Sequence, residues 1–426
     1  MKKIRDGYKI TEIGEIPEEW YISKLSELAQ IKRGASPRPI NNPKWFSEKK
    51  NVGWIRISDV TKTKKYLNST EQYLSDEGVA KSRLVKPNDL IMSICATVGK
   101  PIILNIDACI HDGFILFDDL NNSKIITDYL YYLLQKKEEE FKGMGQTGTQ
   151  ANLNTNIVGS TLIAIPTIKE QKKIASILST VDEQIDNIDA LIEKNKELKK
   201  GLMQTLLTKG IGHTKFKKTE IGEIPEEWEV KNLSEVVWYQ EGPGLRKWQF
   251  TSAGIKVINV TNLVGNYLDL SNTSRYIDES EVEKKYKHFL IDENDIVVAS
   301  SGNSWGKVSV VRKRDLPLLM NTSVIRFKSM EEERLSTKYL LQFLKSDAFK
   351  KQIALLITGS AQPNFGPYHL DRTKIATPNI NEQLKIASIL SEADEKIKKY
   401  ENKKQKLEEL KKGLMQQLLT GKIRVI

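Results

Sequence analysis

The side chains with the clearest chemical potential in this chain are basic and amide groups that gather in loops of two segments, body one (residues 20–165) and body two (residues 228–377). Arginine and lysine can pair with guanine edges, asparagine and glutamine with adenine, and serine or threonine with either. Further basic groups would hold phosphates and set position without reading bases. The candidate contacts with nucleic acid are Arg33, Arg38, Lys44, Arg56, Lys62, Lys64, Lys65, Lys100, Gln146 and Thr149 in body one, and Arg246, Lys247, Trp248, Asn262, Asn303, Lys307 and Gln362 in body two.

None of these residues is specific by itself, and each is also compatible with ordinary solvated surface. Gln146, Thr149 and Gln362 fall in polar, glycine-containing loops at residues 144–154 and 358–366. Such loops could equally be tight connections, with the side chains satisfying the turns.

Motifs for catalysis are missing from the chain. No Gly-x-Gly-x-x-Gly joins a strand to a helix, and no P-loop pattern indicates an ATP site. The Asn- or Asp-Pro-Pro-aromatic tetrapeptide that amino-methyltransferases use on a flipped base does not occur. The four histidines are too scattered for a metal cluster. We therefore expect a chain that is not an enzyme and binds no metal or cofactor.

Composition supports a polyanionic partner. The formal net charge is +11 and the pI is about 9.2, which favours nucleic acid, although a merely basic soluble protein has the same balance. Two cysteines make no disulfide framework and suit a reducing cytoplasm. The first ten residues lack the apolar run of a signal peptide, and no stretch reaches the roughly 18–20 apolar residues of a membrane helix.

Two internal repeats frame the bodies. TEIGEIPEEW occurs unchanged at residues 11–20 and 219–228, and residues 166–211 match residues 378–423 at 27 of 46 positions without a gap. Repetition on this scale indicates a duplicated scaffold. Because the two bodies differ much more than their frames, we expect two different recognition surfaces on one symmetric support.

The longer repeat predicts two long helices. Apolar residues step by four and three, which is typical of a coiled-coil seam. Thr167 with Glu170 and Asn379 with Glu382 have the spacing of helix caps, and Gly210 and Gly421 mark the ends. The predicted seam consists of Ile174, Leu178, Val181, Ile185, Ile188 and Ile192 in the first helix, and Ile386, Leu390, Ala393, Ile397, Tyr400 and Leu407 in the second.

The simplest partner of each helix is its own repeat, laid antiparallel about a pseudo-twofold axis. The alternatives are that each helix covers only its own domain, or pairs between chains. Both copies of KKGLMQ place a glycine inside the helix, Gly201 and Gly413, which costs about 1 kcal/mol relative to alanine. Another element could approach the backbone closely there, or the glycine could be an inherited residue without a present role.

The bodies show a mixed α+β pattern. In each, a helix-like piece (residues 23–30 and 232–237) precedes short strand-like runs such as residues 89–94 and 295–300, and a helix follows. The predicted fold is α+β, with two mixed α/β target-recognition domains separated by an antiparallel coiled coil. The predicted segments are a first recognition domain (1–165), a central helix (166–210), a linker with the second tag (211–227), a second recognition domain (228–377) and a C-terminal helix (378–423).

Taken together, the tag TEIGEIPEEW, the helix starts IPTIKEQKKIASIL and TPNINEQLKIASIL, the KKGLMQ ends and the tandem order resemble the specificity subunit of type I restriction–modification systems. The resemblance spans essentially the whole chain. It implies that two target-recognition domains each read one half of an asymmetric bipartite site in double-stranded DNA. It further implies that the coiled coil sets the spacer between the half-sites and docks two modification subunits.

In that family S-adenosylmethionine, ATP and magnesium belong to the modification and restriction subunits, so this chain is expected to bind none of them. Three other interpretations stay open on the sequence: a specificity subunit of another defence system, a coiled-coil adaptor that binds proteins, and an enzyme with an unrecognised site. The target sequence and the spacer length are not encoded in any recognisable pattern.

Overall fold

The computed structural model describes residues 5–146, 153–271, 273–357 and 364–426. The chain forms two compact units, each described here by itself: unit 1 contains residues 1–189 and 402–426, and unit 2 contains residues 190–401. These units do not follow the predicted segments, because each long helix contributes one half to unit 1 and the other half to unit 2.

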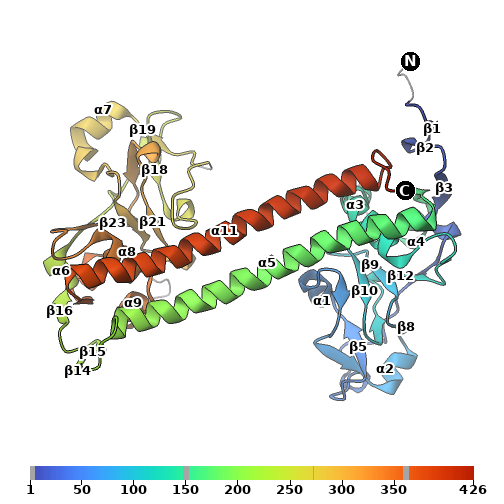
Figure 1. Cartoon of the computed structure of the whole chain (residues 1–426), viewed down its shortest axis with the longest axis horizontal. Coiled ribbons are helices and arrows are strands. Elements are labelled where there is room, and N and C mark those ends of the chain that lie inside the picture. Colours follow the sequence, from blue (N-terminus) through green and yellow to red (C-terminus); the bar gives the residue numbers. More distant parts are fainter. Residues whose placement is uncertain (1–4, 147–152, 272, 358–363) are drawn as a thin grey trace. The chain divides into compact units, whose positions relative to one another are not determined.

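Unit 1 holds the first recognition domain (Figure 1). Its strands are β1 (Tyr8–Thr11), β2 (Gly14–Pro17), β3 (Tyr21–Lys24), β4 (Gln30–Arg33), β5 (Val52–Ile55), β6 (Tyr66–Leu67), β7 (Gln72–Leu74), β8 (Arg83–Val85), β9 (Leu90–Ser93), β10 (Pro101–Leu104), β11 (Ala108–Ile110), β12 (Phe114–Asp118) and β13 (Leu162–Ile165). Its shorter helices are α1 (Ile57–Lys62), α2 (Asp76–Ala80), α3 (Thr127–Gln146) and α4 (Thr155–Ser160). Two sheets, ordered β4-β12-β9-β10-β6 and β7-β5-β11-β8, build the body of the domain.

Unit 2 repeats this plan with its own strands and helices. The strands are β14 (Phe216–Thr219), β15 (Gly222–Pro225), β16 (Glu229–Asn232), β17 (Val237–Glu241), β18 (Ile255–Ile258), β19 (Tyr276–Ile277), β20 (Ile296–Ala299), β21 (Val308–Val310), β22 (Leu318–Met320), β23 (Val324–Ser329) and β24 (Lys374–Thr377). The shorter helices are α6 (Leu233–Val236), α7 (Glu279–Glu281), α8 (Thr337–Lys345), α9 (Asp347–Leu356) and α10 (Pro367–Leu370). The two main sheets are ordered β17-β23-β20-β21 and β19-β18-β22.

The two domains correspond strand by strand. The parallel pair β5–β11 of unit 1 matches the parallel pair β18–β22 of unit 2, and β4–β12–β9 matches β17–β23–β20. The mixed α+β prediction is confirmed. The helix-like pieces are confirmed in part: Leu25–Glu27 form a 3-10 helix and α6 spans Leu233–Val236. Residues 23–24 and 232, at the start of these pieces, instead end strands that pair with β13 and β24.

The long helices are α5 (Ile168–Lys209) and α11 (Ile380–Leu418). The caps are as predicted: the Glu170 amide donates to Thr167 Oγ1 at 3.3 Å, and the Glu382 amide donates to Asn379 Oδ1 at 3.0 Å. Gly210 and Gly421 follow the helix ends with φ of +65° and +69°, the left-handed conformation that terminates helices.

Within each unit, segments of α5 and α11 pack antiparallel. In unit 1, Lys411 Nζ lies 2.7 Å from Asp182 Oδ1, and Lys404 Nζ lies 2.8 Å from Asp189 Oδ1. In unit 2, Lys199 Nζ lies 2.6 Å from Asp394 Oδ1 in the same antiparallel register. Lys404, which replaces an apolar residue of the first repeat, is therefore an ion-pair partner of the facing helix.

Most of the predicted seam residues are buried, but some of them also belong to a domain core and three are only half-buried. Ile174 and Leu178 join the core of the first recognition domain together with Met415 and Leu418 of α11, and Ile386 and Leu390 join the core of the second with Leu206 and Leu207 of α5. The start of each helix therefore serves both its own domain and the facing helix. Ala393, Tyr400 and Leu407 are only half-buried.

The two helix-interior glycines make no close approach within this chain. A Cβ at Gly201 or Gly413 would meet no other atom within 4 Å. Among the described residues no element of this chain is such a close neighbour, both glycines face open space, and the approach of a further partner stays a prediction.

The tags explain the glutamate that is repeated at the start of both long helices. Each tag forms a hairpin, β1–β2 or β14–β15, that leads to a buried tryptophan. Trp20 Nε1 donates to Glu170 at 3.0 Å, and Trp228 Nε1 donates to Glu382 at 3.1 Å. Arg424, which follows α11, donates from Nε to Glu170 at 2.7 Å, and His213, which follows α5, lies with its Nε2 2.9 Å from Glu382. We call these two clusters the tag junctions. Each junction ties a tag, a helix start and the end of the facing helix together.

Among the helices built from described residues, none combines the length and the apolar character needed to cross a bilayer.

Candidate nucleic-acid interface

Several loops of the first recognition domain converge where β4 leaves its sheet. Gly34 follows β4, and a Cβ there would lie 2.0 Å from the His111 carbonyl oxygen, so only glycine permits this approach. Ser36 Oγ donates to Asp112 Oδ1 at 3.0 Å, and Arg38 Nη2 donates to Asp112 Oδ2 at 3.2 Å. The Arg33 Nε–H donates to the Asp112 carbonyl oxygen at 2.8 Å. Asp112 therefore organises two of the predicted arginines on one surface.

Burial and neighbouring groups shift the pKa values of three titratable side chains at this surface. Burial by itself would raise the pKa of the Asp112 carboxyl, but the hydrogen bond from Ser36 and the charge of Arg38 outweigh it and lower that pKa. Burial raises the pKa of the nearby Cys95 thiol and lowers the pKa of His111. At neutral pH Asp112 is the charged acid of the group, while Arg33 and Arg38 stay exposed and cationic.

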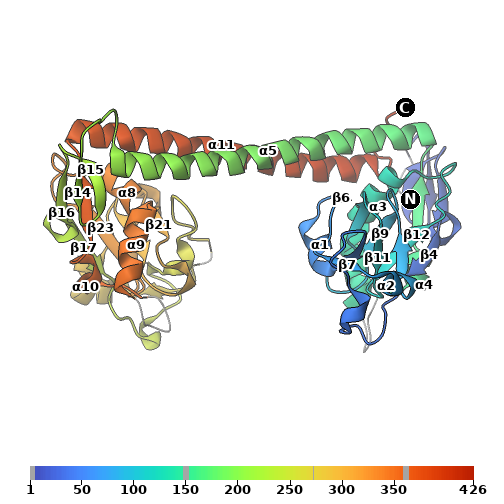
Figure 2. The same cartoon turned by 90° about the horizontal axis from the view of Figure 1, so that it is seen from below.

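The second domain builds the same surface from different residues. Gly242 follows β17, and a Cβ there would lie 2.3 Å from the Asn321 carbonyl oxygen. Ser301 forms a strand-like bridge with Asn364, and the Phe365 amide donates to the Ser300 carbonyl oxygen at 3.0 Å. In Figure 2, α2 of unit 1 and α10 of unit 2 each lie at the end of their domain that is remote from the long helices.

Most predicted contacts in the second domain lie on exposed loops. Arg246, Lys247 and Trp248 follow Gly242, and Trp248 is 78% exposed, which is unusual for so large an apolar ring. Asn303 and Lys307 are exposed in the loop between β20 and β21. Asn262, in contrast, is 3% exposed; its amide donates to the Asp269 carbonyl and to Thr273 Oγ1. Asn262 therefore holds its own loop, and its prediction as a DNA contact gives way to this structural role.

In the first domain, Lys44 and Lys62 are exposed at the surface. Lys44 Nζ lies 4.1 Å from the centroid of the Trp45 ring, and Lys62 Nζ lies 2.6 Å from Glu71. Arg56 is half-buried at the start of α1, and Lys100 donates to the Thr61 carbonyl oxygen at 3.1 Å. Burial lowers the pKa of Lys100. Three further predictions, for the side chain of Gln146 and for Thr149 and Gln362, fall outside the described residues.

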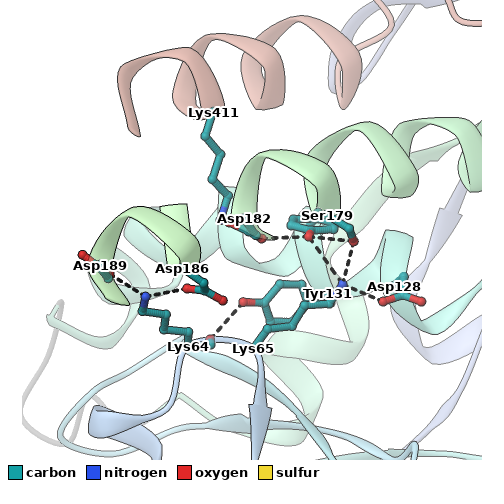
Figure 3. Close-up of polar contacts among 10 residues, drawn as sticks. Lys64, Lys65, Asp128, Tyr131, Ser179, Asp182, Asp186, Asp189 and Lys411 are labelled. Carbon is teal, nitrogen blue, oxygen red and sulfur yellow. Dashed lines mark hydrogen bonds and ion pairs between the residues drawn. The ribbon is translucent and has the colours of Figure 1, made fainter. Parts of the chain in front are cut away.

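Lys64 and Lys65 attach the domain to α5 (Figure 3). Lys64 Nζ pairs with Asp186 and, at 2.6 Å, with Asp189. The Lys65 side chain is only 10% exposed; its Nζ lies 2.7 Å from Asp128 and 3.0 Å from Ser179 Oγ. The Lys65 ammonium is therefore mostly buried and already engaged by partners within the chain. These two lysines are better described as a tether between the recognition domain and the helix.

The tether extends through α3 to the facing helix. Tyr132 of α3 donates to Asp182 of α5 at 2.8 Å, and Lys411 of α11 forms an ion pair with the same Asp182. Tyr131 donates to the Lys64 carbonyl oxygen at 3.0 Å, so the loop backbone is held as well as its side chains.

Unit 2 has a matching tether with changed residues. Lys345 of α8 lies 3.5 Å from Asp394, the counterpart of Asp182, and donates to Asn266 Oδ1 at 2.6 Å. Burial lowers the pKa of Lys345, although the charge of Asp394 opposes this. Lys398, where the first repeat has Asp186, lies 5.2 Å from the centroid of the Tyr267 ring. Each domain is thus attached to its helix pair at one common position.

Sequence reasoning missed the acid that organises the first surface and the two acids at the centre of the tethers. Asp112, Asp182 and Asp394 belong to no motif, and only their spacing within the repeat relates Asp182 to Asp394. The described residues contain no group of three or more metal-binding side chains.

Comparison with known proteins agrees with this architecture. The family described as type I restriction modification DNA specificity domain matches residues 17–199 and 225–409, one match for each half of the chain. The chain therefore belongs to the type I restriction–modification specificity subunits, the components of these systems that recognise DNA and are not catalytic.

Individual relatives cover nearly the whole chain. It is 30% identical to the type I restriction enzyme MjaVIII specificity subunit of Methanocaldococcus jannaschii over 96% of this chain and 94% of that protein. The EcoBI specificity subunit of Escherichia coli is 23% identical over 96% and 87%. The crystal structure of a type I S subunit from M. genitalium has the same fold, with a TM-score of 0.56, 15% identity, and coverage of 98% of this chain and 97% of that one.

Proposed function

We propose that this chain binds double-stranded DNA at an asymmetric bipartite site, with each recognition domain reading one half. The observation that carries the proposal is the pair of matched loop surfaces beyond β4 and β17. In each domain a glycine follows this strand at the same pairing register, while the side chains around it differ in type and charge. A shared frame with different contact groups is what two independent readers of two different half-sites require.

The helices supply the second part of the proposal. α5 has 42 residues, which corresponds to about 63 Å of helix. We propose that the paired helices set the number of unread base pairs between the half-sites. The two tethers and the two tag junctions support this role, because they attach each recognition domain firmly to its helix pair.

The third part concerns partners. Two modification (methyltransferase) subunits would dock on the two repeat-related helix surfaces, and restriction subunits would complete the assembly in the cytoplasm. S-adenosylmethionine, ATP and magnesium would be bound by those subunits. The solvent-facing Gly201 and Gly413 offer each partner a place of close backbone approach.

Exchange of one recognition domain tests the proposal. Residues 20–165 are replaced by the corresponding segment of a relative, the variant is expressed with its modification subunits, and the methylated motif is mapped by single-molecule sequencing. Only one half-site should change. A change in both halves would show that the readers are not independent, and methylation without any sequence preference would refute the function itself.

A further inference from the structure

Arg33 and Glu241 occupy the same position in the two recognition domains. Arg33 ends β4 and pairs with Ile115 of β12; Glu241 ends β17 and pairs with Ile325 of β23. The following glycine amide donates to the corresponding carbonyl in each domain, from Gly34 to Phe114 at 2.9 Å and from Gly242 to Val324 at 3.1 Å. One point of the shared frame therefore carries a cation in one domain and an acid in the other.

Arg33 is prepared for a bidentate contact. Its Nε–H is committed to the Asp112 carbonyl oxygen, which restrains the guanidinium plane. Neither terminal nitrogen of Arg33 has a hydrogen-bond partner among the described residues. A guanidinium with both terminal groups open matches the O6 and N7 acceptors of guanine.

Glu241 shows the opposite chemistry. Its carboxylate is half-buried, burial raises its pKa, and it has no hydrogen-bond or ion-pair partner among the described residues. Its Oε2 faces Gly366 of the loop before α10, 3.7 Å from where a Cβ on that glycine would lie. An acid that is partly desolvated and unpaired is unfavourable unless a donor reaches it. Among the base edges in the major groove, the exocyclic amino group of cytosine is the donor that glutamate accepts from.

We infer that Arg33 and Glu241 are matched specificity determinants, Arg33 selecting a guanine in one half-site and Glu241 a cytosine in the other. The inference rests on the proposed function, since it assigns bases to the two readers. It also explains why an acid persists beside Arg246 and Lys247 in a loop region that is otherwise basic.

The test uses the whole chain assembled with its modification subunits. Glu241→Gln keeps the shape of the side chain and removes its charge, and Arg33→Gln removes the guanidinium and its charge in the first domain. Glu229, an exposed acid on β16 outside the loop surface, provides the matched control Glu229→Gln. For each variant, the methylated motif is mapped, and binding to the wild-type site and to single-base variants is measured over a range of salt concentrations.

Glu241→Gln should lose about 5- to 140-fold in discrimination for cytosine at one position of one half-site, with the other half-site unchanged. Arg33→Gln should lose guanine discrimination in the other half-site by a similar factor. Glu229→Gln should change neither.

Three results would overturn the inference: an unchanged motif in both variants, a changed position that is not cytosine or guanine, or an equal loss of affinity on all sequences. The last result, with a salt slope reduced by about one for Arg33→Gln, would assign Arg33 to a phosphate. A wild-type assembly that methylates no bipartite motif would instead show that the proposed function had failed.

Discussion

Replacement of Lys65 by methionine should destabilise unit 1 measurably, because it removes the centre of the tether and keeps the apolar stem. The lost interactions are an ion pair to Asp128 at 2.7 Å, a hydrogen bond to Ser179 at 3.0 Å and a longer one to Tyr132 at 3.4 Å. Hydrogen bonds that involve a charged group contribute about 1.5–3 kcal/mol each. The Asp128 side chain is 45% exposed, so water can solvate it after the change, and Ser179 retains Tyr132 as a partner.

Because of these compensations, we expect the free energy of unfolding to fall by about 2 kcal/mol, near the lower end of the range for one such hydrogen bond. For a unit of this size such a loss lowers the melting temperature by about 4–8 °C. The assay is thermal unfolding of the purified chain followed by circular dichroism.

Lys64→Met is the matched control. Lys64 pairs with Asp186 and Asp189, but its side chain is 57% exposed, so the pair contributes about 0–1 kcal/mol and less at high salt. The reasoning is refuted if both variants lose the same stability, or if Lys65→Met unfolds within about 1 °C of the unchanged chain.

Three further predictions concern separate parts of the chain. Ala96 has φ of +56°, where its counterpart Gly302 has +66°, so Ala96→Gly should raise the free energy of unfolding by up to about 1 kcal/mol, and Gly302→Ala should lower it, both measured by chemical denaturation. Burial raises the pKa of the Cys109 thiol from 9.0 to about 12. Above pH 9 the unfolded chain releases this proton and the folded chain keeps it. The contribution of this thiol to stability is therefore lost as pH rises from 9 to 12. Cys109→Ala should show a flatter decline in stability over that range, and native Cys109 should resist thiol labelling at pH 8 while Cys95 reacts. Insertion of seven residues into both α5 and α11 preserves the seam and adds about 10 Å, so the spacer in the methylated motif should widen by up to about three base pairs with both half-sites unchanged; an unchanged spacer would contradict the role of the helices.

The sequence by itself determined the features that repeat or have a period. The seam from Ile174 to Ile192, the caps at Thr167 and Asn379 and the terminal glycines Gly210 and Gly421 were all predictable, because helix formation and capping depend on residues three or four apart. The two-domain α+β plan followed from the duplicated frame for the same reason.

Only the tertiary structure decided what individual side chains do. Lys65 and Lys62 are three residues apart in one basic run, yet Lys65 is buried against α3 and α5 while Lys62 is exposed. Glu170 and Glu382 have capping-box spacing, but their carboxylates bind the tag tryptophans, which are 150 and 154 residues away in sequence. The equivalence of Arg33 and Glu241 likewise appears only from strand register. These roles depend on contacts between distant segments, and the type of a residue and its near neighbours carry no information about such contacts.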